Sequence, residues 1–192
     1  MMPDKQQQRK MLLHSRRSLT DEERKAFSGS IIAKLIALPE YQQADTCLLF
    51  ASMRDEVQTK ELILDALKAG KRVCLPYITS TKDSLMQAAQ ISSLDDLEKG
   101  AYGILAVRAD RLHFVEPEEL DFILVPAVGM DRQGWRMGMG GGYYDRYLAR
   151  AAGAVRACAI YSCQLADDIV RDEHDAQADL ILTETDLIRI KK

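Results

Sequence analysis

The residues best suited to chemistry lie in one glycine-rich segment that a carboxylate closes, Arg136-Met-Gly-Met-Gly-Gly-Gly-Tyr-Tyr-Asp145. Glycine has no Cβ, so the backbone N–H groups of such a segment can approach a ligand closely. A helix is predicted from Tyr143 onward, and a glycine turn that leads into a helix N-terminus binds anions, most often phosphate. Arg136 adds a planar cation, and Asp145 can hold a metal ion that itself holds phosphates. A tight surface turn would also need glycine, but it would not need the arginine, the tyrosines and the acid.

This segment differs from the two common phosphate loops. A Walker loop ends in Gly-Lys-Ser/Thr, and that tripeptide does not occur in this chain. The dinucleotide fingerprint needs a third glycine where Tyr143 stands, and it normally follows the first strand. Here the segment comes late, after the apolar run Phe122-Ile-Leu-Val-Pro126. The sequence therefore predicts a phosphate site of another kind.

Basic residues near the N-terminus form a second candidate group. Lys5 and Arg9 are four positions apart and share a helix face, and Arg16 falls within about 20° of Lys5 on a helical wheel. Three cations on one stripe could close over a triphosphate. The spacing alone fits a solvent-facing basic stripe better, so both interpretations stay open here.

Glu56 stands in a polar segment directly after an apolar run. It is either a helix N-terminal acid, favoured by the helix dipole, or an acceptor for a ligand ring rich in N–H donors. Tyr143 and Tyr144 either belong to the core or contact a ligand, and Trp135 either flanks the site or packs.

Size and composition exclude several classes of protein. A chain of 192 residues with a net charge of −3 is expected to form one domain, and it is not basic enough for a general nucleic-acid binder. We expect no membrane span and no signal peptide, and a cytoplasmic, monomeric protein with four reduced cysteines. The three histidines are scattered, which does not favour a zinc site.

Alternation of helices and strands predicts the fold class: α/β, a single-domain three-layer α/β/α structure with a mostly parallel, Rossmann-like sheet. N-terminal helices at about residues 4–38 should pack on an α/β core at about 45–185. Further helices are expected at 60–69 and 143–152. Strands are expected at 46–52, 72–76, 85–91, 121–126, 155–161 and 179–183. In such sheets ligands bind beyond the carboxyl ends of the strands, which should bring the 52–56 segment and the glycine segment to the same edge.

The chain resembles the 5-formyltetrahydrofolate cyclo-ligase family (5,10-methenyltetrahydrofolate synthetase). The similarity includes the glycine segment and four other stretches: Lys5-x-x-x-Arg9, Ser52-Met-Arg-Asp-Glu-Val57, Gly70-Lys-Arg-Val-Cys-Leu-Pro76 and Leu124-Val-Pro-Ala-Val-Gly-Met-Asp131. It implies ATP- and Mg²⁺-dependent conversion of 5-formyltetrahydrofolate to 5,10-methenyltetrahydrofolate, with release of ADP and phosphate.

The resemblance also implies roles for individual residues. The implied ATP contacts are Lys5, Arg9, Arg136, Met137, Gly138, Met139, Gly140, Gly141, Gly142, Tyr143 and Tyr144, of which Arg136 and Tyr144 are the expected catalytic residues. Ala51, Glu56 and Tyr143 are implied to contact the folate, and Asp145 and Asp175 to bind magnesium.

One part of the chain departs from the family pattern. Residues 103–104 keep a Gly-Ile pair, but the Glu-Pro that tends to follow it in relatives is absent. Two alternatives therefore stay open: an ATP-dependent enzyme acting on another formylated or carboxylated metabolite, and a non-catalytic regulator that binds folate or nucleotide.

Overall fold

The computed structural model describes residues 4–100, 105–173 and 175–191. Three features of the sequence lie outside these ranges: Pro3 before the first helix, the Gly-Ile pair at 103–104, and His174. Among the described ranges, no helix combines the length and the apolar character needed to cross a bilayer.

An eight-stranded sheet forms the centre of the described structure. Its order is β13 (Leu187–Arg189), β12 (Leu180–Leu182), β10 (Val155–Ala159), β7 (Phe122–Leu124), β1 (Thr46–Leu48), β2 (Arg72–Ser80), β3 (Leu85–Ile91) and β6 (Phe114–Val115). The strands from β12 to β2 are parallel, and β13, β3 and β6 join antiparallel at the edges. The prediction of a mostly parallel sheet is confirmed.

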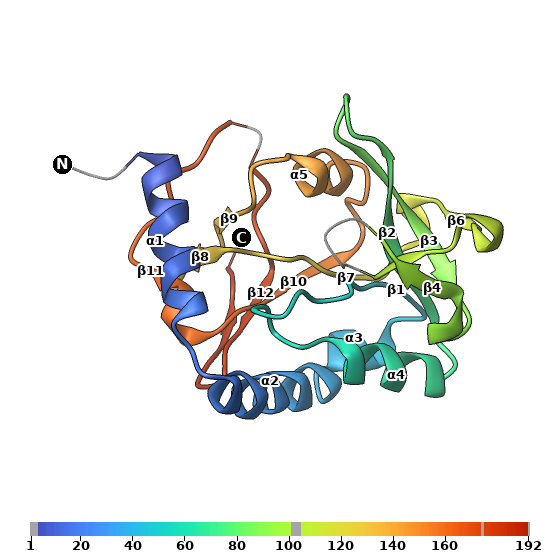
Figure 1. The fold of residues 1–192 in the computed structure, drawn as a ribbon, viewed down its shortest axis with the longest axis horizontal. Coiled ribbons are helices and arrows are strands. Elements are labelled where there is room, and N and C mark those ends of the chain that lie inside the picture. The colour runs from blue at the N-terminus through green and yellow to red at the C-terminus, as the bar shows by residue number, and fades with distance from the viewer. Residues whose placement is uncertain (1–3, 101–104, 174, 192) are drawn as a thin grey trace.

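Helices cover both faces of this sheet (Figure 1). On one face lie α2 (Asp21–Ile36), α3 (Pro39–Gln43) and α4 (Lys60–Lys68), and on the other lies α5 (Tyr143–Leu148). Each face has its own buried apolar cluster, because the strands of a sheet covered on both sides are apolar on both sides. This is the predicted three-layer α/β/α arrangement.

Helix α1 (Lys5–Arg17) stands at one end of the sheet, beside a small sheet of β11 (Leu165–Ala166), β8 (Gly129–Asp131) and β9 (Arg136–Met137) (Figure 1). The helix comes very close to β8: a Cβ at Gly129 would lie 2.5 Å from the Leu12 side chain. Only glycine fits there, and this contact fixes α1 next to the strands that lead into the glycine segment.

The local sequence predicts where the helices begin more accurately than where they end. Asp4 with Gln7, and Thr20 with Glu23, form the capping boxes that begin α1 and α2. Helix α5 is shorter than predicted and ends at Leu148, whose carbonyl accepts a hydrogen bond from Arg156 at 2.9 Å. That bond satisfies a carbonyl at the helix end, and it comes from a strand, so the local sequence does not reveal it.

Several short elements were not predicted. They are α3, the strand pair β4 (Leu97–Lys99) and β5 (Leu105–Val107), the edge strands β6 and β13, and the small sheet next to α1. Strand β2 also continues to Ser80, past its predicted end at Pro76, because it pairs antiparallel with β3 over its length.

Candidate active site

The glycine segment forms a loop between β9 and α5. Gly140 and Gly142 have φ values of +97° and +69°, which side chains with a Cβ rarely adopt. Gly142 is the N-cap of α5. The loop carries an exposed Met139 at its tip. Its backbone is therefore held in a conformation that requires glycine.

Arg136 lies directly below this loop and is 5 % exposed. Its Nη2 contacts Asp145 Oδ1 at 2.5 Å, and its Nη1 donates to the Pro126 carbonyl at 3.2 Å. Its Nε is buried and has no partner within the described structure. Buried polar groups are nearly always paired, so this N–H is a donor available to a ligand or a water molecule.

Tyr144 is the second residue with an unpartnered buried group, its hydroxyl. Burial raises the pKa of this phenol above its usual range; the nearby Arg136 opposes that shift and Glu56 adds to it. Both charges thus act on the same hydroxyl. Tyr143 is half-buried against the cluster that α5 covers.

Two cations of α1 reach this region. Arg9 Nε donates to the Gly138 carbonyl at 2.8 Å, and the Arg9 guanidinium lies against Gly140, about 3.5 Å from where a Cβ would be. Lys5 Nζ contacts Asp175 at 2.6 Å and Asp172 at 2.7 Å. Burial opposes the charge of Lys5, but its hydrogen bonds to these acids outweigh burial and raise its pKa.

The two acids expected to bind magnesium lie on adjoining segments. The backbone N–H of Ala176, next to Asp175, is 3.4 Å from Asp145 Oδ1. Asp145 is paired with Arg136, and Asp175 with Lys5. Among the described residues no three His, Cys, Asp or Glu side chains gather into a metal site. Two carboxylates nonetheless suit Mg²⁺, which is commonly held by one or two carboxylates together with phosphates and water.

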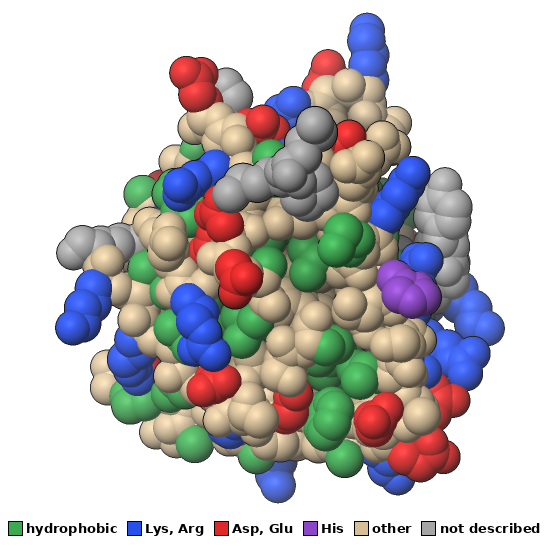
Figure 2. Space-filling model, turned by 90° about the vertical axis from the view of Figure 1, so that its left-hand side faces the viewer, with side chains coloured by type: hydrophobic (Ala, Val, Ile, Leu, Met, Phe, Trp, Pro, Cys, Tyr) green, Lys and Arg blue, Asp and Glu red, His purple; other side chains and the backbone are tan. Residues whose placement is uncertain are grey.

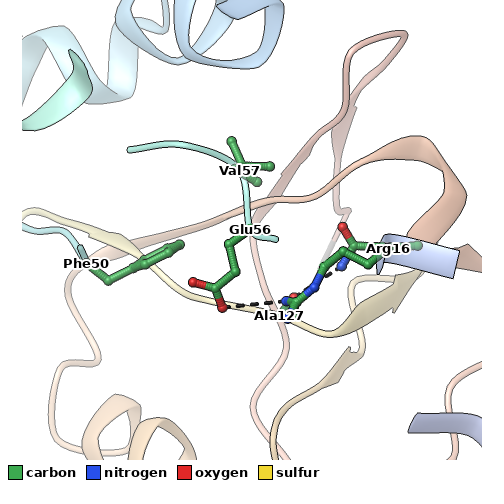
Figure 3. Close-up of a pocket in the computed structure, with 7 residues that line it drawn as sticks. Arg16, Phe50, Glu56, Val57 and Ala127 are labelled. Carbon is green, nitrogen blue, oxygen red and sulfur yellow. Dashed lines mark hydrogen bonds and ion pairs between the residues drawn. The ribbon is translucent and has the colours of Figure 1, made fainter. Parts of the chain in front are cut away.

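Glu56 lies in a small cavity of about 10 Å³, lined by Arg16, Phe50, Glu56, Val57, Ala127, Ala159 and Gln164 (Figure 3). Burial raises the pKa of Glu56; the Met53 backbone N–H, which donates to Oε2 at 2.9 Å, and Arg16 oppose that shift. A cavity of this volume holds about one water molecule, whereas ligand pockets commonly measure 300–1,000 Å³, so its walls must move apart before a ligand ring can enter.

Arg16 does not join Lys5 and Arg9 at the glycine loop. Its side chain is buried, with 1 % of the residue exposed, and pairs with Asp55 at 2.9 Å and with Glu56 at 3.5 Å (Figure 3). The expectation that three cations of this stripe close over one triphosphate is wrong for Arg16, because α1 is long enough to carry it to the other end of the site. The helical spacing gives its face, but its partner Asp55 is 39 residues further along the chain.

The remaining predicted residues lie next to these groups. Ala51 is partly buried. Its neighbour Phe50 lines the cavity, whereas Ala51 is not among the lining residues. Trp135 packs with Leu12 and lies under Arg171, 4.8 Å from the ring centre. Its surroundings are those of a packing residue.

Sequence reasoning missed Gln164. Its side chain is buried in the cavity wall, donates to the Val128 carbonyl at 2.8 Å and accepts from the Tyr161 N–H at 3.0 Å. No local motif marks it, because its partners come from separate segments.

The face around α1 carries basic and acidic side chains interspersed with one another (Figure 2).

The fold and the site define an α/β/α protein in which a glycine loop with adjacent arginines and a separate small cavity that contains Glu56 are the candidate binding features. The chain belongs to the 5-formyltetrahydrofolate cyclo-ligase family, whose model matches residues 1–184. It is 32 % identical to the 5-formyltetrahydrofolate cyclo-ligase of Mus musculus over 88 % of this chain and 87 % of that protein. Identity to the Escherichia coli K12 protein of the same name is 27 %, over 90 % of this chain and 96 % of the other.

Solved structures agree with this assignment. The NMR structure of Aquifex aeolicus 5,10-methenyltetrahydrofolate synthetase superimposes with a TM-score of 0.86 at 34 % identity, over 98 % of this chain and 93 % of that one. The Mycoplasma pneumoniae 5,10-methenyltetrahydrofolate synthetase gives 0.77 at 26 % identity, over 95 % and 99 %. The family match spans nearly the whole chain.

Proposed function

We propose that this protein is a 5-formyltetrahydrofolate cyclo-ligase, which converts 5-formyltetrahydrofolate and ATP to 5,10-methenyltetrahydrofolate, ADP and phosphate. The observation that carries the proposal is that two of the three unpartnered buried side-chain groups among the described residues, Arg136 Nε and the Tyr144 hydroxyl, belong to the glycine segment. Family membership gives the reaction, and these free donors support the proposal that the glycine segment is its site in this chain.

The phosphates of ATP are proposed to bind at the glycine loop. Gly140 and Gly142 keep the backbone free of side chains, and Arg9 and Arg136 lie against the loop. Lys5 is a further cation at its edge, once it exchanges its acidic partners for phosphate. Guanidinium groups suit phosphate because their N–H donors match its oxygens in pairs.

Asp145 and Asp175 are the proposed carboxylates for magnesium. The metal would neutralise charge on the phosphates of ATP. A metal ion held by these two acids would release Arg136 from Asp145 and Lys5 from Asp175, and would leave both cations to phosphate oxygens. The ion pairs of the two acids with Arg136 and Lys5 support this proposal.

The chemical task is to turn a formamide oxygen into a leaving group. The formyl oxygen attacks the γ-phosphorus, the bond to the β,γ-bridging oxygen breaks, and ADP leaves. N10 then attacks the formyl carbon and loses its proton, and the C–O bond breaks to release phosphate. Phosphoryl transfer needs alignment and charge neutralisation more than a protein nucleophile. Arg9 and Arg136 provide the charge, and Tyr144 is placed to donate to an oxygen near Arg136.

The pterin end of the folate is proposed to enter the cavity of Glu56. Phe50, Val57 and Ala127 provide apolar walls for a flat ring, and Glu56 provides an acceptor for its N–H groups (Figure 3). The cavity holds about one water molecule as it stands, so the ring must displace its walls on entry, and the remainder of the substrate extends toward Tyr143 and the glycine loop, where the formyl group meets ATP.

An absorbance assay tests the function directly. Purified protein with ATP, Mg²⁺ and 5-formyltetrahydrofolate should produce the ultraviolet band of the methenyl product, and omission of ATP or Mg²⁺ should abolish it. ATP binding without product would discard this substrate while leaving the phosphate loop in place.

A further inference from the structure

Helix α1 carries a cation that the phosphate site does not use. Arg16, in its last turn, is among the most buried side chains of the described structure, although it is charged. Burying a guanidinium is costly unless acids pair with it. A buried guanidinium beside the cavity that we assign to the substrate therefore suggests a role in substrate binding.

Two acids share this one guanidinium, on unequal terms. Asp55 Oδ2 receives both Nε (3.2 Å) and Nη2 (2.9 Å) of Arg16, and Arg17 Nε from outside at 3.3 Å. Burial opposes the ionisation of Asp55, but these cations lower its pKa below the usual range. Glu56 Oε1 has only the longer contact of 3.5 Å with Nη1. Asp55 therefore takes most of the hydrogen bonding, and Glu56 keeps acceptor capacity facing the cavity.

We propose that Arg16 is a positioning residue for the folate substrate: it holds the Glu56 carboxylate in place and charged at the cavity wall. This role rests on the proposed function. Arg16 does not need to touch the substrate, because it acts through Glu56. Arg9 lies on the same helix. The position of α1 therefore determines both where Arg9 stands at the glycine loop and, through Arg16, where the Glu56 carboxylate stands in the cavity.

The groups that face Glu56 define how it should titrate. They are Arg16 on α1, Asp55 on its own segment, Tyr144 on α5, and Tyr161 after β10, whose hydroxyl donates to the Glu56 carbonyl at 2.8 Å. Arg16 is the cation among them that favours the carboxylate, and Asp55 is the acid that disfavours it. Removing one or the other must therefore move the pKa of Glu56 in opposite directions.

The experiment is a carbon-13 NMR titration of the Glu56 carboxyl in the intact protein. Arg16→Met should raise the pKa of Glu56 by about 1–3 pH units, the usual effect of losing a neighbouring opposite charge. Asp55→Asn should lower it. Arg16→Lys, which keeps the charge, should stay close to the wild type. Arg17→Met, which removes the exposed partner of Asp55, is the matched control and should move it least.

The same variants are then assayed across a range of pH, with 5-formyltetrahydrofolate as the varied substrate, to obtain kcat/KM. On the acid side of the profile, the ionised fraction of Glu56 falls about tenfold for each pH unit by which its pKa rises. Arg16→Met should therefore lose activity at low pH through KM, and Asp55→Asn should gain it. A purely structural role for Arg16 would lower kcat without moving the acid limb. Unchanged titration of Glu56 in a folded Arg16→Met protein overturns the proposal, whatever Asp55→Asn does.

The two proposals fail in different ways. If the wild type makes no methenyl product but the Glu56 titration shifts as expected, the proposed function fails and the action of Arg16 on Glu56 stands. If the wild type is active and the titration does not shift, Arg16 is not the positioning residue. Should Arg16→Met not fold, Arg16→Gln replaces it: this variant keeps N–H donors but removes the charge, and it should raise the pKa of Glu56 in the same direction.

Discussion

The two halves of the site are built from different materials. The glycine loop half consists of backbone, cations and acids: Arg9 and Arg136 lie against glycines with positive φ. The cavity half has apolar walls and one carboxylate, Glu56, held by a buried arginine. Under the proposed function, the first half takes the charged phosphates of ATP and the second takes the pterin end of the folate.

This difference shows how one helix can serve two recognition problems. Arg9 and Arg16 are seven residues apart, about 10 Å along α1, and they take part in opposite halves. A change in the first half should therefore act on ATP, a change in the second on folate, and a displacement of α1 on both. Single substitutions can separate these outcomes.

The largest effect is expected at Arg136. Arg136→Lys keeps the charge but cannot supply Nε, Nη1 and Nη2 together. We expect kcat to fall by about 10²–10³-fold, the usual result of losing one preorganised charge-stabilising contact. The measurement is steady-state turnover to the methenyl product. Arg150→Lys, an exposed arginine just after α5, is the control and should retain activity; equal losses in both variants would contradict the assignment.

Glu56→Gln tests the other half. A hydrogen bond to a charged group contributes about 1.5–3 kcal/mol, so kcat/KM for 5-formyltetrahydrofolate should fall by about 10–150-fold while the KM for ATP stays near that of the wild type. Kinetics with each substrate varied in turn measure this. A rise in the KM for ATP of the same size would show that the halves are not separate.

Asp175→Asn tests the metal assignment. We expect the Mg²⁺ concentration for half-maximal activity to rise by at least about tenfold, the scale of metal-site changes. Asp172→Asn is a matched control, because Asp172 contacts the same lysine but is mostly exposed. A magnesium requirement that responds equally to both changes would argue that the acids only hold Lys5.

Gly140→Val tests whether the loop needs its backbone geometry. Valine at a φ of +97° carries about 1–3 kcal/mol of strain, and its Cβ would lie in van der Waals contact with the Arg9 guanidinium, 3.5 Å away. We expect kcat/KM for ATP to fall by about tenfold or more, with a smaller effect on folate. Gly29→Ala in α2, where a Cβ meets open space, should instead stabilise the fold by about 0.5–1 kcal/mol without loss of activity. Melting curves and kinetics on both variants make the comparison.

The first half of the site could be predicted from the sequence because its signals are local. Glycines at 138–142, an arginine before them and an acid after them occupy one short segment, and the spacing of Lys5 and Arg9 fits one helix face. Local geometry was enough to expect a phosphate loop. The fold class followed in the same way, from the alternation of helices and strands.

The second half could not be predicted in the same detail. Arg16 meets Asp55 and Glu56 through the tertiary docking of α1 on β8; the helical wheel gives the face of Arg16 but not these partners. Gln164 enters the cavity from a turn without any motif. Short edge strands such as β13 are missed because three residues show no periodicity.

The smallest expected effect concerns stability, and it tests whether Glu56 is kept for function. Burial raises its pKa in the folded protein above the usual value near 4.5. The stability that such a group contributes is fully present below its unfolded-state pKa and is lost as pH rises through the folded-state pKa. At neutral pH the ionised Glu56 therefore lowers the free energy of unfolding, whereas Glu56→Gln removes this cost and can keep the hydrogen bond from Met53.

We expect Glu56→Gln to melt at a higher temperature than the wild type at pH 7, and the difference to vanish below about pH 4, where the wild-type carboxyl is protonated in both states. Thermal unfolding of both proteins at several pH values measures this. The acids whose pKa is lowered, such as Asp55 and Glu40, weaken both proteins alike in acid, so the difference isolates Glu56. A variant less stable at pH 7 would mean that Arg16 compensates fully for the buried charge. A more stable, less active variant would mean that the cavity keeps a carboxylate which the fold does not need, and binding of the substrate would then be the reason for it.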